Sequence, residues 1–106
     1  MTESKAIKDS FVRLRKFGQT VFNFNSSRAN NPGIKGFPDW LIITRNYNLV
    51  FIEVKIGKDK LKIEQEVVIR KLANMMGIPG SRVNVFICKD KKTADNISDQ
   101  ILKGEL

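Results

Sequence analysis

The sequence predicts an α/β fold in which a small mixed sheet is flanked by helices, in the order α-β-β-β-α-β-α. Segments rich in β-branched and aromatic residues alternate with segments whose apolar residues recur at helical spacing. A strand, a helix and a strand also follow one another between residues 49 and 88, which indicates a right-handed crossover joining two parallel strands. A chain of 106 residues can bury one core, so residues 1–106 are expected to form a single domain.

The first elements are a helix, a strand and a loop. Apolar residues at helical spacing predict a helix over 2–17 with a basic outer side, and Gly18 suits its C-terminal end. Residues 20–25 read as a short strand. Residues 26–36 are dense in Asn, Gly and Pro and therefore predict a loop.

The remaining elements begin with a hairpin. Residues 39–44 and 48–56 are predicted strands joined by a polar turn, and they precede a helix over 61–76 and a strand over 81–88. Thr93 is expected to N-cap a last helix, whose few apolar residues predict loose docking. The residues that we also expect in the core are Trp40, Met75, Met76 and the phenylalanines.

The composition narrows the chemistry. With 19 Lys and Arg against 11 Asp and Glu, the net charge of +8 favours polyanionic partners such as nucleic acid, although a basic protein without such a partner has the same composition. The chain has no histidine, and Cys88 is its one cysteine, which excludes serine-histidine and cysteine-histidine catalysis and a thiolate metal cluster. Any metal should be a hard ion held by oxygen, namely Mg²⁺ or Mn²⁺.

Three charged residues interrupt the apolar hairpin. Glu53 and Lys55 are two positions apart on one strand and therefore project to the same face, while Ile52, Val54 and Ile56 project to the other. Antiparallel pairing is expected to bring Asp39, at the start of the preceding strand, close to both. Two carboxylates in proximity repel each other, and a divalent cation between them removes the conflict, with the Val54 carbonyl as a further ligand.

A lysine beside such a metal suits phosphodiester hydrolysis. It can hold the attacking water and stabilise charge on the phosphoryl group. The alternative is structural: Asp39 begins a turn after Pro38, and Glu53 with Lys55 forms an ion pair on a half-exposed strand.

These residues resemble the PD-(D/E)xK nuclease superfamily, with "PD" at 38–39 and "EVK" at 53–55, and more closely its VRR-NUC (virus-type replication-repair nuclease) family. The elements that carry the resemblance occur in the family's order: Glu3, "GFPD" at 36–39, "IEVK" at 52–55 and Gln65. The resemblance implies a restriction-endonuclease-like α/β/α core.

The resemblance also implies roles for individual residues. Asp39, Glu53 and the Val54 carbonyl would bind the metal, and Lys55 would assist the attacking water. Gln65 would support Lys55 or the phosphate, the alternative being a solvated glutamine. Glu3 would complete the catalytic set, the alternative being a favourable charge at the helix N-terminus.

Basic residues supply candidate phosphate contacts, each of which could instead be ordinary solvated surface. Those expected to bind nucleic acid are Lys5, Arg13, Arg28, Lys35, Lys58 and Lys60, with Lys8, Arg15 and Lys16 as further candidates. Tyr47 is a candidate for stacking on a nucleobase.

The function expected from these observations is that of a Mg²⁺- or Mn²⁺-dependent DNA endonuclease. The resemblance implies a homodimer acting on branched DNA such as four-way (Holliday) junctions. Two alternatives are a basic DNA-binding module with a non-catalytic acidic cluster, and an RNA-processing nuclease with the same metal site. Without a signal peptide or an apolar stretch of membrane-spanning length, the chain is expected to be cytoplasmic and to have no membrane partner.

Overall fold

The sheet at the centre of the molecule has four strands in the order β1-β2-β3-β4. The computed structural model describes residues 2–24 and 35–106, and its strands are β1 (Thr20–Asn23), β2 (Trp40–Ile43), β3 (Leu49–Val54) and β4 (Val83–Cys88). β1 and β2 pair antiparallel, as do β2 and β3, whereas β4 runs parallel to β3. The predicted mixed sheet and the parallel strands of the predicted crossover are both confirmed.

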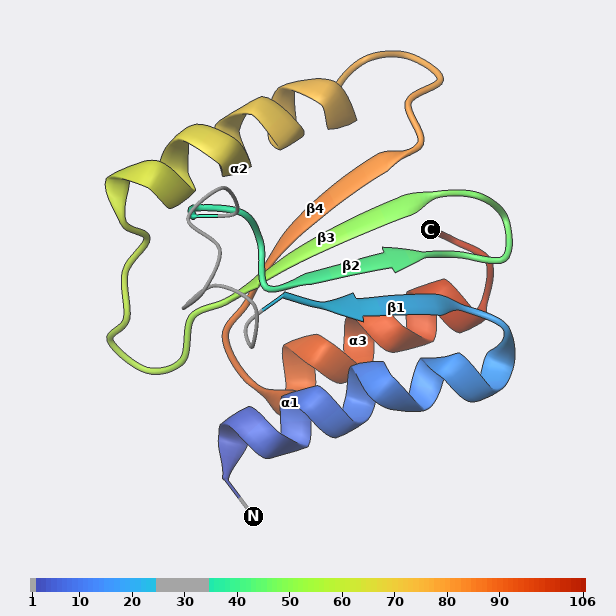
Figure 1. Cartoon of the computed structure of the whole chain (residues 1–106). Helices are drawn as coiled ribbons and strands as arrows, with labels where there is room; N and C mark the ends of the chain where they lie inside the picture. Colours follow the sequence, from blue (N-terminus) through green and yellow to red (C-terminus); the bar gives the residue numbers. More distant parts are fainter. Residues whose placement is uncertain (1, 25–34) are drawn as a thin grey trace.

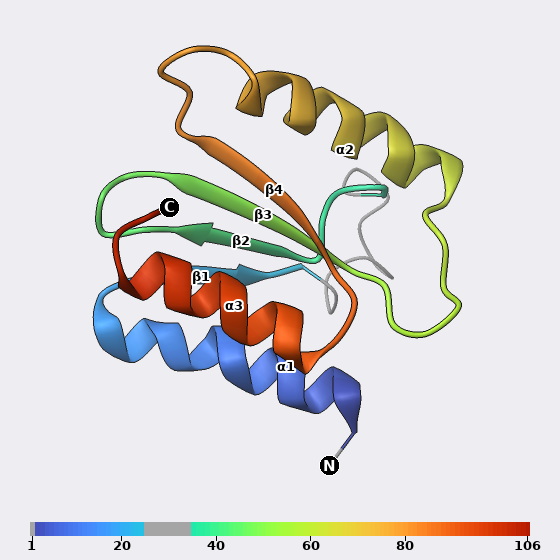
Figure 2. The same ribbon diagram turned by 180° about the vertical axis from the view of Figure 1, so that it is seen from behind.

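Helices cover both faces of this sheet. α1 (Glu3–Val12), its 3-10 continuation η1 (Arg13–Phe17) and α3 (Lys91–Leu102) cover one face, while α2 (Ile63–Met76) lies over the other (Figure 1 and Figure 2). The molecule therefore has three layers, and the predicted element order is confirmed.

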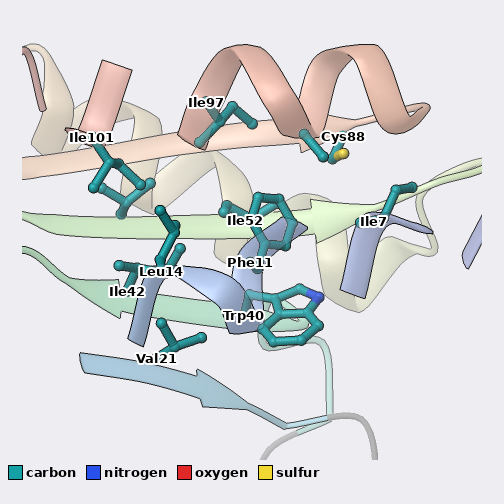
Figure 3. Packing of buried hydrophobic residues seen from close by; sticks show 12 residues of the cluster. Ile7, Phe11, Leu14, Val21, Trp40, Ile42, Ile52, Cys88, Ile97 and Ile101 are labelled. Atoms are coloured by element: carbon teal, nitrogen blue, oxygen red, sulfur yellow. The ribbon is translucent and has the colours of Figure 1, made fainter. Parts of the chain in front are cut away.

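The main core lies between the sheet and the layer of α1 and α3 (Figure 3). Phe11 packs its ring against Trp40, with the ring centroids 5.4 Å apart. The assignment of Trp40 to the core is thereby confirmed. A second, smaller cluster under α2 comprises Phe51, Leu72 and Val83.

The ends of the elements differ from the prediction by a few residues. The first helix is α-helical only to Val12 and continues as η1, which ends at Gly18 with φ +84°. α2 begins at Ile63 rather than at residue 61. The predicted loop covers residues 26–36. Its residues 26–34, which include Arg28, lie outside the described residues.

The prediction that the last helix is loosely docked is wrong. Ala94, Ile97 and Ile101 of α3 are all buried in the main core. The helix needs little apolar surface because small residues allow it to approach α1 closely. The Ser10 hydroxyl donates to Asp95 Oδ1 at 2.8 Å across this contact, where Ser98 is fully buried.

The predicted N-cap of this helix is also wrong. Asp90, not Thr93, occupies the cap position, and its Oδ1 accepts hydrogen bonds from the backbone N–H and the hydroxyl of Thr93. Both residue types cap helices, but the aspartate ranks ahead of threonine, and its position three residues earlier adds a turn to the helix.

The assignment of Met75, Met76 and all phenylalanines to the core is wrong in part. Met75, Met76, Phe17 and Phe22 are exposed. Of the helices in the described part of the chain, only α2 lies over this face of the sheet; its side that carries Leu72 is covered, whereas Met75 and Met76 lie on its exposed sides. Among residues 2–24 and 35–106, no helix has the length and apolar character needed to cross a membrane.

Candidate active site

Two buried carboxylates lie side by side on adjacent strands at one end of the sheet. Asp39 directly precedes β2, and the pairing of Trp40 with Ile52 places it across from Glu53 on β3. The exposed fractions are only 5% for Asp39 and 1% for Glu53. Both line a cavity of about 240 Å³. The predicted approach of Asp39 to Glu53 across the hairpin is confirmed.

Main-chain hydrogen bonds hold Asp39 in place. Its Oδ2 atom accepts from the backbone N–H of Val54 at 2.7 Å, and its carbonyl accepts from the N–H of Phe24 at 2.8 Å. The carboxylate of one strand is therefore tied to the backbone of the next. A carboxylate so close to a second one is costly to bury, which is the arrangement that a bound cation compensates.

The faces of β3 are as predicted. Ile52 is buried in the core beneath α1 and α3, and Val54 and Ile56 pack against that core. Phe51 packs under α2, and Glu53 shares its face because side chains alternate along a strand. Lys55, which follows β3, lines the cavity of the two carboxylates, and its N–H donates to the Cys88 carbonyl at 2.9 Å.

Gln65 reaches the same cavity from α2. It lies in the first turn of the helix, is buried, and accepts a hydrogen bond from the Lys62 N–H at its Oε1 atom, 2.8 Å away. The alternative of a solvated glutamine is therefore wrong. The side chain serves as a helix cap and also faces Asp39 and Glu53.

Gly36 brings the first turn of α2 close to the segment that precedes Asp39. It has φ +84°, and a Cβ placed on it would lie 2.8 Å from the backbone oxygen of Glu64. Lys35 Nζ lies 3.2 Å from Glu64 Oε1. Hydrogen bonds from the backbone and from Lys35 lower the pKa of Glu64. The glycine of the "GFPD" motif thus permits the close approach that sets Gln65 beside the carboxylates.

Glu3 has a different position from the other candidate catalytic residues. Its Oε1 atom accepts a hydrogen bond from the backbone N–H of Lys91 at 2.6 Å, which links the N-termini of α1 and α3. The residue of α1 that lines the acidic cavity is its neighbour Ser4. Ser4 was not predicted as a site residue, because nothing in the sequence distinguishes it except its position next to Glu3.

A lysine-lined hollow adjoins the acidic cavity on the side of α1. It measures about 320 Å³, contains Lys5 and Lys8, and shares Ser4 and Val54 with the acidic cavity. Lys5 also lies 3.5 Å from Asp9 in an exposed ion pair, which is weak in water.

A second such hollow adjoins the cavity on the side of the segment that follows β3. It measures about 450 Å³, contains Lys58, Lys60 and Lys89, and shares Lys55 and Asp59 with the acidic cavity. Lys89 was missed from the sequence, although it follows β4 and the carboxyl ends of parallel strands meet at one edge of a sheet. We call the acidic cavity and the two hollows that share lining residues with it the trough, whose centre carries Asp39 and Glu53 and whose flanks carry the lysines.

The other basic candidates lie elsewhere. Arg13 lines a separate small hollow with Asp9, Lys91 and Asp95. Lys35 is paired with Glu64 on α2. Arg28 lies outside the described residues.

The donor set at the centre of the trough suits a hard divalent cation. Among the described residues, no group of three His, Cys, Asp or Glu side chains is arranged to bind a metal. An ion held between Asp39 and Glu53 would therefore complete its coordination with the Val54 carbonyl and water. Mg²⁺ prefers this combination of few carboxylates and several waters.

Comparison with known proteins identifies a solved structure of similar fold. No family model matches the sequence, and no curated protein matches it. A solved structure described as a VRR_NUC domain is similar to this chain, with a TM-score of 0.67 and 23% identity over 92% of this chain and 94% of the other.

The chain has the fold of a VRR_NUC domain. At this level of identity the similarity establishes the architecture, and the predicted restriction-endonuclease-like α/β fold of the VRR-NUC type is confirmed. Within the VRR_NUC fold, the two carboxylates come from β3 and from the residue before β2, while Gln65 comes from α2, the helix that covers this face of the sheet.

Proposed function

We propose that this chain is a metal-dependent nuclease that hydrolyses phosphodiester bonds in DNA and that residues 1–106 act as a single catalytic domain. The observation that carries the proposal is the buried pair Asp39 and Glu53, which shares a cavity with Lys55 on a VRR_NUC fold. A binding module has no need to bury two like charges together, whereas a metal site does.

Each residue of the centre has a distinct task. Asp39, Glu53 and the carbonyl of Val54 hold Mg²⁺ or Mn²⁺, which when bound supplies an activated water and neutralises phosphate charge. Lys55 positions the attacking water and stabilises charge that develops on the phosphoryl group. Gln65 orients Lys55 or a phosphate oxygen from the other side of the cavity. Glu3 takes part only if it leaves the Lys91 N–H.

The lysine-lined flanks of the trough support internal cleavage. Lys5 and Lys8 on one side and Lys58, Lys60 and Lys89 on the other can hold phosphates before and after the scissile bond. A strand can therefore enter and leave the centre, as an endonuclease requires. Such contacts give affinity without reading bases, so selectivity comes from the shape of the DNA.

Branched DNA is the substrate that we propose, with four-way junctions as the leading case and a homodimer as the active form. One chain carries one Asp39–Glu53 centre, and two chains related by a twofold axis would supply the two cuts that a junction requires. A monomer in equilibrium sedimentation at working concentration would contradict this part of the proposal.

The deciding experiment measures cleavage of end-labelled four-way junction, flap, duplex and single-stranded DNA, and of the matching RNA substrates, in Mg²⁺, in Mn²⁺ and in EDTA. The native protein is compared with Asp39→Asn and Lys55→Ala, and Lys71→Ala on the outer side of α2 is the matched control for lost charge. We expect metal-dependent cutting in the native protein and in Lys71→Ala only. Binding without cutting in either metal would favour a DNA-binding module, and a preference for the matching RNA substrates would favour an RNA-processing nuclease.

A further inference from the structure

A second cavity lies at the opposite end of the sheet from the acidic centre. It measures about 870 Å³ and is lined by residues from the end of η1, the turn after β2 and the end of α3. Figure 1 shows these three segments at the same end of the sheet. Asp39 precedes β2, whereas Thr44 in this distal cavity follows β2, so the strand separates the two sites. The volume lies within the usual range for small-molecule pockets.

The charge of the distal cavity is opposite to that of the acidic centre. Lys16, Arg45 and Lys103 line it, all three are exposed, and none of its described lining residues is acidic. Three cations from three separate segments thus surround one hollow. Such a site attracts an anion and rejects a metal ion.

The backbone of Arg45 is anchored, and its stem lies close to Gly18. Its backbone N–H donates to Oε1 of the buried Gln19 at 2.8 Å. Its aliphatic part rests on Gly18, where an added Cβ would lie 2.8 Å from Arg45 Cδ. Beyond this stem, the guanidinium presents its donors in a planar fork, which matches the oxygens of a phosphate.

The same cavity has an apolar side. Phe17, 49% exposed, and Leu102, 40% exposed, both line it. An exposed aromatic ring among cations is the combination that binds a nucleobase together with its phosphate. An acidic peptide would use the cations but has no need of the ring.

We propose that the distal cavity binds one nucleotide unit, with the phosphate on Arg45, Lys16 and Lys103 and the base against Phe17. The unit is either a free nucleoside monophosphate or the 5′-phosphorylated end of a nucleic-acid strand. The site is independent of phosphodiester cleavage and does not require the acidic centre.

The test is an NMR and calorimetric titration in EDTA, so that no cleavage interferes, with AMP, inorganic phosphate and a 5′-phosphorylated dT6 as probes. We expect AMP to shift the signals of Arg45 and Phe17. We expect its affinity to fall about tenfold or more in Arg45→Gln, which loses charged hydrogen bonds, and about tenfold in Phe17→Leu, which loses stacking. Lys71→Gln, at an exposed residue of α2, is the charge control, and circular dichroism verifies the fold of each variant.

The outcomes separate the possible ligands. Equal affinity for AMP and dT6, followed at the signals of Arg45 and Phe17, identifies a free nucleotide, and much tighter binding of dT6 at these same signals identifies a strand end. Phosphate as tight as AMP, displacement of AMP by a polyglutamate peptide, or shifts confined to the trough would each overturn the proposal. Asp39→Asn should bind AMP as the native protein does even though it no longer cuts, which keeps this proposal separate from the nuclease assignment.

Discussion

Asp39 Oδ2 and the backbone N–H of Val54 are joined by a hydrogen bond of 2.7 Å that links the start of β2 to the end of β3. The carboxylate that we assign to the metal therefore also satisfies a main-chain donor next to Glu53. Removal of the side chain has two effects, one on catalysis and one on the hairpin. These effects can be separated by the choice of replacement.

Asp39→Asn should abolish metal-dependent cleavage with little loss of stability, because the amide oxygen can still accept from Val54. Asp39→Ala should abolish cleavage and also lower the free energy of unfolding by about 1–3 kcal/mol, since the Val54 N–H loses its acceptor. Urea denaturation of the three proteins without metal measures the difference. Equal stability of the two variants would mean that this hydrogen bond contributes nothing.

Gln65 also has two tasks, and a matched pair of variants distinguishes them. Gln65→Ala removes the acceptor for the Lys62 N–H and should destabilise the protein by about 0.5–2 kcal/mol. Gln65→Glu keeps an acceptor at the helix terminus but adds a further negative charge to the cavity, so it should keep the helix cap while cleaving more slowly. Thermal unfolding and cleavage rates are both measured. Full activity of Gln65→Glu would exclude Gln65 from the chemistry.

Gly36→Ala should be more harmful than Gly57→Ala, although both glycines have positive φ. The strain of a left-handed alanine, about 1 kcal/mol, applies to both. Only at Gly36 does the new Cβ also meet the backbone of Glu64, whereas nothing lies within 4 Å at Gly57. We expect Gly36→Ala to lose about 2–4 kcal/mol by strain and overpacking. Urea midpoints that coincide would show that α2 can move away freely.

Because the thiol of Cys88 is buried, we expect the folded protein to lose stability at alkaline pH. Burial raises its pKa from 9.0 to about 11. As the pH rises between these values, the unfolded chain releases this proton while the folded protein keeps it. The contribution of this group then falls by about 1.4 kcal/mol per pH unit.

Cys88→Ala provides the control for this effect, because it removes the thiol and leaves the other ionisable groups in place. The free energy of unfolding of the native protein should decline more steeply between pH 9 and pH 11 than that of the variant. Parallel curves would contradict the raised pKa.

The strands and the acidic pair were predictable because their signals are local. The alternation of side chains along a strand places Glu53 and Lys55 on one face. The short turn of the hairpin fixes the register of its two strands, and this register places Asp39 opposite Glu53. The docking of α3 was not predictable in the same way. It depends on Ser10 and Ala94, whose small size matters only once α1 is known to lie beside α3.

The distal cavity shows the same limit more clearly. Lys16, Arg45 and Lys103 lie far apart in the sequence, and each is an ordinary surface residue by its type. Their grouping depends on where three chain segments end, and no local pattern encodes that position. Lys89 is an intermediate case, since its place beside Lys55 follows from the crossover once β4 is taken to be parallel.

The contact between α1 and α3 also has a consequence for synthesis. Ser10 bonds to Asp95 and Glu3 to Lys91, so partners 85 and 88 residues apart in the chain hold one layer together. On a ribosome, the apolar side of α1 has no complete binding surface until α3 has left the exit tunnel. The core should therefore form only after residue 102 emerges, and a nascent chain stalled before residue 91 should remain sensitive to protease.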